Sequence, residues 1–426
     1  MKVLIVGGGG REHALVWKIS MSKGISEIFC APGNGGISDL ATCIPINPED
    51  IEGLVEFSKK EGIDLVIVGP ESPLALGIVD KFSQIDIPVF GPKKDAALIE
   101  TSKIYAKEIM KKYNVPTANY ASFSNHHEAS LYVDEKDLPF VIKADGLCGG
   151  KGAYIIRDRE NAHSVLEDLF IKKIHGSAGE RIVIEDFLVG EEVSYLVFSD
   201  GKEILPLVPS QDHKRLLDND EGPNTGGMGA YTPVPFVDSE MENTIKNKIM
   251  TRMIEGLREE GIEYKGILYG GLIVVSNSPY VLEFNARFGD PETQAILFKM
   301  ESDLLPIIIS CINGTLGEIK EIKWKKGYTV CVVIASRGYP EKPEKDKIIN
   351  GLESLKNLSD VMVFHAGSKK INGKYYTSGG RVLNIVARGD NLKEAIRKAY
   401  EAVSMIHFEG MHYRKDIGQK AFKYLN

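Results

Sequence analysis

The chain has 426 residues, a formal net charge of -7 and a hydrophobic fraction of 43%, which is typical of a globular protein large enough for several domains. No apolar run approaches the roughly 18 residues that a membrane helix needs, and the acidic balance argues against a basic nucleic-acid-binding face. The five cysteines form no CxxC pair, so neither a disulfide framework nor a zinc site is indicated. We therefore expect a cytoplasmic protein that binds small molecules and neither membranes nor nucleic acid.

The first hundred residues alternate short apolar runs with helix-patterned segments, which predicts a parallel α/β domain. The runs are KVLIVG, EIFCAPG, DLVIVGP and IPVFGP. Since open α/β sheets bind ligands at the carboxyl ends of their strands, the loops at 7–13, 32–36 and 69–72 are candidate ligand sites. The glycine turn before the first helix is suited to an anionic ligand, although a bare packing turn is the alternative. Glu12 stands where a dinucleotide fingerprint requires glycine, which disfavours NAD.

Two further lobes are predicted beyond residue 102. A small α+β lobe should contain a helix at 103–113, strands at 139–145, 152–156 and 181–188, and a helix at 161–170. A larger lobe should follow, with strands at 191–200 and 202–210, a polar loop at 210–231, a helix at 239–260, a hairpin at 265–287 and helices at 292–300 and 303–311.

A separate C-terminal α/β domain is predicted from apolar runs at 328–336, 361–367 and 381–389 and a helix at 392–405. We interpret the charged residues 413–416 as a solvated or interdomain surface. The expected fold class is therefore multidomain α/β and α+β. The expected boundaries are 1–101, 102–320, with a small mobile lobe at about 118–190, and 321–426.

A second glycine cluster, KADGLCGGKG, runs from Lys143 to Gly152 between two predicted strands. It is not a Walker A loop, because Lys151 is followed by glycine where Ser or Thr should hold Mg²⁺. A mobile hairpin over phosphates fits better, with the two lysines contacting different phosphates of one nucleotide. An ordinary tight hairpin with solvated lysines is the alternative.

The run VLEFNARFGDPET places polar side chains on alternate positions of a predicted strand. Glu283, Asn285 and Arg287 should share one face, with Leu282, Phe284 and Ala286 on the core face. A carboxylate and an amide oxygen are ligands that Mg²⁺ takes beside nucleotide phosphates, and the arginine could hold an anionic substrate group. A solvated sheet face is the alternative, but asparagine is disfavoured within strands.

The glycine-rich loop at 210–231 is long enough to suggest a functional loop. His213 within it is a candidate general base. No Ser or Cys nucleophile with a fixed partner is visible, however, and a lone histidine is more often structural.

Several of these motifs, taken in chain order, closely resemble the glycinamide ribonucleotide synthetase family of the ATP-grasp superfamily. The motifs are GGGGREHAL at 7–15, APGNGG at 31–36, VGPE at 68–71, KADGL and GKG within 143–152, SQDHKR at 210–215, GPNTGGMGAY at 222–231, EFNARFGDPETQ at 283–294, FHAG, GGRVL and RKDIG. The resemblance spans essentially the whole chain. It implies an N-terminal substrate-binding domain, a two-lobed ATP-grasp domain and a C-terminal domain.

The resemblance also implies a role for individual residues. ATP would be held by Lys103, Lys143, Gly149, Gly150, Lys151, Gly152, Glu185, Asp186, Phe187, Leu188 and Glu192, and Mg²⁺ or Mn²⁺ by Glu283 and Asn285. The chemical centre would contain Asp212, Lys214, Arg287 and Asp290, and the substrates would contact Gly9, Gly10, Arg11, Glu12, Glu71 and Asn224.

The implied reaction joins glycine to 5-phosphoribosylamine through glycyl phosphate, with ATP as co-substrate and no enzyme nucleophile. We expect a monomer, with a weak oligomer as the alternative. Competing function classes are a related ATP-grasp ligase with other substrates, a dehydrogenase and a nucleotide sensor without turnover.

Overall fold

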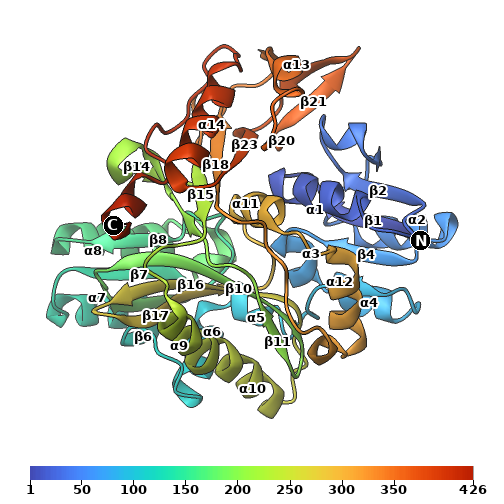
Figure 1. Cartoon of the computed structure of the whole chain (residues 1–426). Coiled ribbons are helices and arrows are strands. Elements are labelled where there is room, and N and C mark those ends of the chain that lie inside the picture. Colours follow the sequence, from blue (N-terminus) through green and yellow to red (C-terminus); the bar gives the residue numbers. More distant parts are fainter. Residues whose placement is uncertain (426) are drawn as a thin grey trace.

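The computed structural model describes residues 1–425 and begins with a five-stranded parallel sheet, ordered β3-β2-β1-β4-β5 (Figure 1). Its strands are β1 (Lys2–Gly7), β2 (Glu27–Pro32), β3 (Thr42–Cys43), β4 (Leu65–Val68) and β5 (Val89–Phe90). The helices of this unit are α1 (Gly10–Ser20), α2 (Ile51–Glu61), α3 (Glu71–Leu76) and α4 (Ile78–Ser83). The predicted parallel α/β domain is confirmed. Strand β3 was not predicted, because two residues carry no alternation.

The small lobe is an antiparallel sheet ordered β6-β9-β7-β8, which has a hydrophobic core of its own. Its strands are β6 (Tyr120–Phe123), β7 (Phe140–Ala144), β8 (Ala153–Ile156) and β9 (Ile182–Asp186). Two short helices, α5 (Leu98–Thr101) and α6 (Lys103–Lys112), lead into it. The lobe adds α7 (His126–Glu135) and α8 (Arg159–Leu166), which continues as one π-helical turn to Ile171. Strand β6 and helix α7 were not predicted; β6 is only partly buried and shows no apolar alternation.

The larger lobe is built on the antiparallel sheet β11-β10-β16-β17. Its strands are β10 (Glu191–Asp200), β11 (Ile204–Pro206), β16 (Lys265–Val275) and β17 (Ser278–Asn285), and its helices are α9 (Ser239–Ile245), α10 (Arg252–Glu259), α11 (Glu292–Lys299) and α12 (Leu304–Asn313). A π-helical stretch at Lys246–Thr251 joins α9 to α10, so the predicted long helix is continuous. Strand β11 is shorter than predicted.

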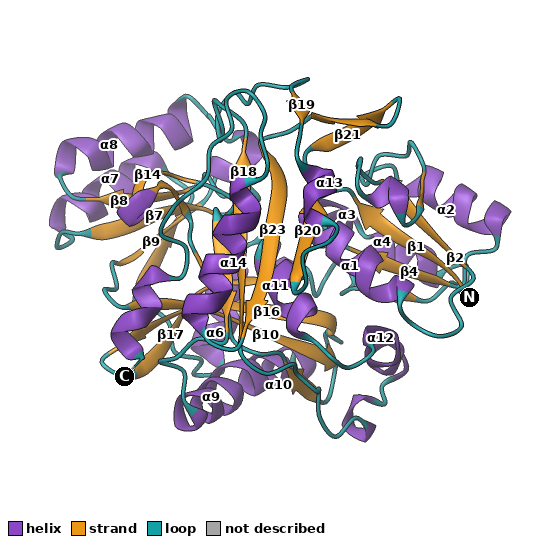
Figure 2. Ribbon diagram, turned by 45° about the horizontal axis from the view of Figure 1, so that its top comes forward, coloured by secondary structure: helices purple, strands orange, loops and turns teal. Residues whose placement is uncertain are grey.

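The C-terminal sheet, ordered β12-β15-β18-β23-β20, takes its first two strands from the long loop of the preceding domain. Its strands are β12 (Gln211–Asp212), β15 (Gly229–Thr232), β18 (Tyr328–Ala335), β20 (Val361–His365) and β23 (Arg381–Gly389), and α14 (Leu392–Ser404) packs on it (Figure 2). A hairpin of β13 (Arg215–Leu217) and β14 (Glu221–Asn224) lies between β12 and β15. One sheet therefore spans the boundary expected at residue 320, and the domain limits stay predictions.

A smaller three-stranded sheet, ordered β19-β22-β21, accompanies the C-terminal sheet. It consists of β19 (Ile348–Ile349), β21 (Ser368–Ile371) and β22 (Lys374–Thr377), with α13 (Leu352–Leu355) beside it. Every helix among residues 1–425 is too short or too polar to cross a bilayer.

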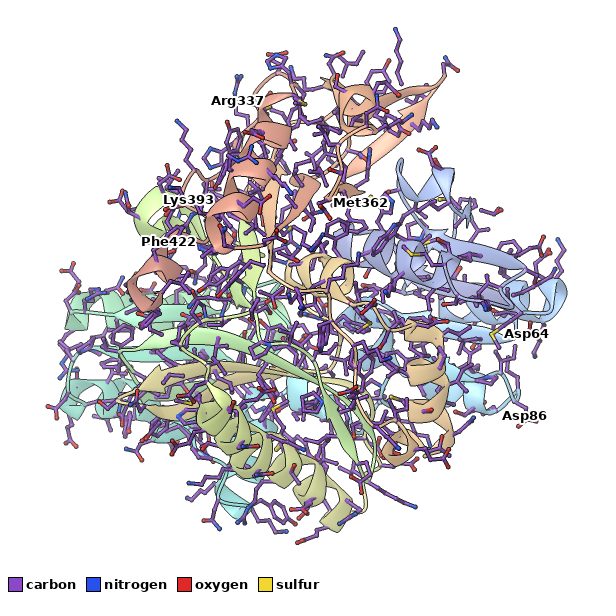
Figure 3. All side chains as sticks on the ribbon, viewed as in Figure 1. Asp64, Asp86, Arg337, Met362, Lys393 and Phe422 are labelled. Atoms are coloured by element: carbon purple, nitrogen blue, oxygen red, sulfur yellow. The ribbon has the colours of Figure 1, made fainter. Side chains whose placement is uncertain are left out.

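Of the charged residues 413–416, Lys415 is exposed and the others are partly or fully buried. Arg414 is only 1% exposed and pairs with Asp220 in the loop before β14, so the interdomain interpretation is the correct one. The chain then forms a short 3-10 helix at Gln419–Tyr424. Phe422, labelled in Figure 3, marks this turn beside the two lobes.

Candidate functional site

A cavity of about 870 Å³ lies where the N-terminal sheet, the two lobes and the C-terminal residues meet. Its walls come from loops at strand ends, where parallel and mixed sheets commonly bind ligands. Most of the predicted site residues line it: Arg11, Glu71, Lys103, Lys143, Gly149, Gly150, Gly152, Glu185, Asp186, Phe187, Leu188, Glu192, Asp212, Lys214, Asn224, Glu283, Asn285, Arg287 and Asp290. The structure thus brings together residues that are far apart in the sequence.

Four predicted site residues lie outside this cavity, and one of them, Gly9, lines the second hollow described below. The amine of Lys151 donates to the carbonyl oxygen of Pro340 at 3.3 Å and points away from the predicted phosphate site. Gly10 is packed so closely that a side chain there would collide with Asn384. The Glu12 carboxylate accepts the Gly9 N–H at 2.5 Å and is 2% exposed, so it shapes the glycine turn and is not free to bind substrate.

Two lysines that line the cavity share one buried carboxylate. Glu185 forms ion pairs with Lys143 and with Lys107, the latter at 2.5 Å, and all three side chains are less than 10% exposed. Burial alone would raise the pKa of Glu185, but the two ammonium groups hold it below its ordinary value. Burial lowers the pKa of Lys107. Because Glu185 binds these lysines, the predicted nucleoside contacts would be made by Asp186, Phe187 and Leu188.

Lys103 is fixed by the cap of α6. The Ser102 hydroxyl accepts the N–H of Tyr105 at 3.1 Å and donates to Asp145 at 3.0 Å, which joins the helix start to the end of β7. The Lys103 amine then donates to the Gly146 carbonyl oxygen at 3.2 Å. The lysine therefore sits at the base of the glycine turn.

The turn at 148–152 requires glycine, and its tip at Gly149 is free of packing. Gly149 and Gly150 have φ values of +55° and +79°, and nothing lies within 4 Å of where a side chain at Gly149 would begin. The turn can therefore approach a ligand by its backbone and can move without breaking a core.

Strand β17 carries the predicted metal ligands on the cavity wall. Glu283 and Asn285 line the cavity, while Phe284 and Ala286 are 2% and 1% exposed. Leu282 was predicted on the core face, but a β-bulge leaves it without a partner on β16 and it lines the cavity instead. Its freed carbonyl oxygen accepts the Lys143 amine at 2.9 Å.

The donor set on β17 suits a divalent cation shared with phosphate. Burial would raise the pKa of Glu283, but Lys214 and Lys143 hold it below its ordinary value, so the carboxylate is ionised. Within residues 1–425 no group of three or more His, Cys, Asp or Glu side chains could hold a metal alone. Mg²⁺ commonly takes one or two protein ligands together with substrate phosphates, which is what this pair can offer.

Arg287 is occupied by protein carboxylates. Its Nε atom lies 3.1 Å from Glu71 and its Nη2 atom 3.1 Å from Glu100, a residue on α5 that the sequence did not single out. Burial opposes ionisation of Glu71, yet Arg287 and Arg11 lower its pKa to about 2. The geometry favours a brace between β17 and the N-terminal sheet over the predicted fork on an anionic substrate.

A cluster of acids lines the cavity around Asp212 and Tyr269. Burial raises the pKa of Asp212 to about 7, Lys214 opposes this shift, and the negative charges of Glu292 and Glu192 add to it. The Lys214 amine pairs with Glu192 at 3.0 Å. Glu292, which the sequence did not single out, accepts the hydroxyl of Tyr269 at 2.6 Å. This part of the cavity therefore offers one ammonium group and one carboxyl group that titrates near neutrality.

A second hollow of about 330 Å³ lies between the N-terminal and C-terminal sheets. Gly9 lines it, as do Asp290 and Arg381 of β23, which also line the larger cavity. The Arg381 Nη1 atom donates to the Asp290 carbonyl oxygen at 2.8 Å, and Nη2 lies 3.3 Å from the Asp290 carboxylate. The two hollows therefore meet at this pair.

His213 is structural. Its side chain is fully buried, and its Nε2 atom lies 3.2 Å from the N–H of Gly418. Burial lowers its pKa to about 3. The structural interpretation of this lone histidine is therefore the correct one.

Known proteins resemble the chain over its whole length. Sequence models described as phosphoribosylglycinamide synthetase match it in three parts: the N domain at residues 1–100, the ATP-grasp (A) domain at 101–293 and the C domain at 329–420. The phosphoribosylamine–glycine ligase of Caldanaerobacter subterraneus subsp. tengcongensis is 48% identical over 417 residues, covering 98% of this chain and 99% of that protein. That of Neisseria meningitidis serogroup B is 46% identical, covering 99% of both.

Solved structures resemble it as well. The crystal structure of phosphoribosylamine–glycine ligase from Thermotoga maritima is 36% identical, with a TM-score of 0.87 over 98% of this chain and 100% of that one. Biotin carboxylase from Campylobacter jejuni is 15% identical, with a TM-score of 0.74 over 97% of this chain and 93% of that one, and so shares the fold alone.

Proposed function

The chain belongs to the phosphoribosylglycinamide synthetase family, and from this premise we propose that it ligates glycine to 5-phosphoribosylamine through a glycyl phosphate intermediate. It is an ATP-dependent ligase of purine biosynthesis. In the first step a glycine carboxylate oxygen attacks the γ-phosphorus of ATP and ADP leaves. In the second the amine nitrogen attacks the acyl carbon, phosphate leaves and the nitrogen gives up a proton. The product is glycinamide ribonucleotide.

We assign the nucleotide to the wall made by the small lobe. Lys103 and Lys143 would contact the phosphates, with the backbone of the turn at 149–152 covering them. Phe187 and Leu188 would face the base and Glu192 the ribose. This assignment is supported by the buried Glu185 bridge, which holds one of the lysines toward the cavity.

Glu283 and Asn285 would hold Mg²⁺ or Mn²⁺. A divalent cation bound there would offset charge on the transferred phosphoryl group. The protein supplies the matching charges itself: the Lys214 ammonium group faces Glu283, and no enzyme nucleophile is needed.

Asp212 would accept the proton that the attacking amine loses. A carboxyl group with a pKa of about 7 can exchange a proton at neutral pH, which efficient acid–base catalysis requires. Asp290 would act beside it by holding Arg381 and the backbone N–H of Arg11, the latter at 3.1 Å. Arg287 would keep β17 in register with the N-terminal sheet.

Phosphoribosylamine would reach the larger cavity through the second hollow. Gly9 lines that hollow, whereas Arg11, Glu71 and Asn224 line the larger cavity. We further propose that the protein works as a monomer in the cytoplasm.

One observation carries the proposal: the carboxylate and amide of β17 lie on the same cavity as the lysines of the small lobe and Lys214. The test measures ADP release with Mg²⁺, ATP and glycine, with phosphoribosylamine made in place from ribose 5-phosphate and ammonia. Each substrate is omitted in turn. Release that needs both substrates, with equimolar glycinamide ribonucleotide, supports the proposal.

A trapping experiment tests the intermediate. Hydroxylamine in place of phosphoribosylamine should yield glycine hydroxamate, because it attacks an acyl phosphate. ADP release without hydroxamate would contradict glycyl phosphate.

A further inference from the structure

The loop that carries Asp212 and Lys214 is held from behind by residues 412–420, which we call the C-terminal segment. Four hydrogen bonds, each between a backbone group and a side chain, join the two. In the first two, His412 Nε2 lies 3.0 Å from the Leu216 carbonyl oxygen and the Lys415 N–H donates to Asp218 at 2.7 Å. In the others, the Asn219 N–H donates to Asp416 at 2.9 Å and the Gly418 N–H to His213 at 3.2 Å. Residues 213, 216, 218 and 219 are thus tied to one stretch of chain.

Arg414 is the centre of this contact. Its guanidinium is 1% exposed and forks onto Asp416 at 2.8 and 2.7 Å, while Nη1 donates to Asp220 at 2.8 Å and to the Arg215 carbonyl oxygen at 3.2 Å. Tyr400 on α14 fixes the backbone, donating to the Arg414 carbonyl oxygen at 2.8 Å. A buried arginine satisfied on all sides fixes the geometry of its partners, because no other arrangement satisfies its charge.

The alternation of side chains transmits this constraint to the cavity. His213 points backward to the C-terminal segment, whereas its neighbours Asp212 and Lys214 line the cavity. Whatever fixes His213 therefore fixes the direction of both neighbours.

We propose that Arg414 is a positioning residue for the ligation chemistry, holding the loop at 213–220 so that Asp212 and Lys214 face the reacting atoms. The inference rests on the proposed function, since that function uses Asp212 to accept the proton of the attacking amine and Lys214 to supply a positive charge. The competing explanation is an interdomain contact that contributes to stability only.

Arg388 provides a matched control. It is also an arginine of the C-terminal domain that forks onto an aspartate, Asp360, at 3.0 and 2.7 Å, and that donates to a carbonyl oxygen, here of Lys326. It lines neither hollow. Arg388→Gln therefore measures what losing such a fork does to stability alone.

The experiment compares Arg414→Gln, Arg414→Lys and Arg388→Gln in the full chain, with rates corrected for the folded fraction. We expect Arg414→Gln to lower kcat about tenfold or more and to raise KM for glycine. The Kd for ADP should stay within about twofold, because the nucleotide lysines belong to another lobe. Arg414→Lys keeps the charge without the fork and should recover part of the rate. Arg388→Gln should leave kcat unchanged.

Equal kcat values in Arg414→Gln and Arg388→Gln would overturn the inference, as would a parallel loss of ADP affinity. If Arg414→Gln does not fold, Asp218→Ala removes only the bond from the Lys415 N–H and should lower kcat in the same direction. Hydrogen exchange should rise at 213–220 and not at 148–152. A wild-type protein that makes no product would contradict the proposed function instead, so the two failures are distinguishable.

Discussion

Two loops line the same cavity, and they differ in how they are held. The turn at 148–152 has no packing around Gly149, whereas the loop at 213–220 is bound along its length by the C-terminal segment. The first loop is free to move, whereas the second keeps its side chains in place. On the proposed assignment, the loop that covers the nucleotide and the loop that carries the ligation chemistry are held independently of each other. This arrangement suits a reaction whose proposed glycyl phosphate intermediate must be kept from water.

Two walls of the cavity also differ in charge. On the small-lobe wall the acid Glu185 is shared by two lysines, so its charge is compensated. On the wall that carries Asp212, this acid lies among other carboxylates and titrates near neutrality. Three experiments test whether this contrast governs catalysis.

The largest effect is expected from Glu283→Gln on β17. The amide keeps the shape of the side chain but not its charge, so turnover should fall at least about a hundredfold through loss of the metal ligand. The fold should be retained, since the residue lines a cavity and not the core. ADP release assays and melting curves check both points.

Glu255→Gln is the control, because Glu255 lies exposed on α10. Its rate should equal that of the wild type. Normal turnover in Glu283→Gln at any metal concentration would sink the metal assignment.

Asp212→Asn should lower kcat about a hundredfold, within the range of general acid–base catalysis. Wild-type kcat should rise with pH through about 7, since the ionised carboxylate accepts the proton, and the variant should lack this inflection. A pH profile of kcat from 5 to 9 is the measurement.

The same substitution should stabilise the fold at alkaline pH, although it lowers kcat. Because the folded-state pKa is raised from 3.8 to about 7, the stability contributed by Asp212 is present at low pH and lost as the pH rises through 7. Asp212→Asn should therefore melt higher than the wild type at alkaline pH, and this gain should be absent below the unfolded-state pKa. An equal difference at both ends of the range would contradict the assigned pKa.

The smallest effect is expected from Gly150→Ala. Alanine at positive φ costs about 1 kcal/mol, which should disfavour the turn and raise KM for ATP severalfold with little change in kcat. The Gly150 amide should gain protection from hydrogen exchange when ATP binds the wild type.

Gly176→Ala is the matched control, since Gly176 also has positive φ, at +56°, in the same lobe but outside the cavity. Similar ATP KM values in the two variants would remove the case for a closing turn. Unchanged exchange at 148–152 with saturating ATP would do the same.

Much of the site could be predicted because its signals are local. Alternation along β17 placed Glu283 and Asn285 on one face, and the glycine turn was visible as composition. Lys107 could not be separated from Lys111 or Lys112, because nothing in the helix pattern says which lysine will meet a buried carboxylate.

Other features depended on distant chain segments. Arg381 reaches the cavity from the C-terminal sheet, and the bulge at Leu282 follows from how β17 pairs with β16. Neither feature could be predicted from the residues that flank it in the sequence. The fold class was predicted correctly. That the long loop contributes β12 and β15 to the C-terminal sheet was not predicted, because both strands are too short to show a period.

The C-terminal segment has a consequence for the order in which the protein becomes active during translation. The ribosome makes the two ATP-grasp lobes before it makes residues 412–420, and domains generally fold as they emerge. A nascent chain would therefore have Lys103, Lys143 and the β17 pair of Glu283 and Asn285 assembled while Asp212 and Lys214 still lacked their support. Such a chain should bind ATP without ligating glycine, so coupling is acquired in the last stage of synthesis.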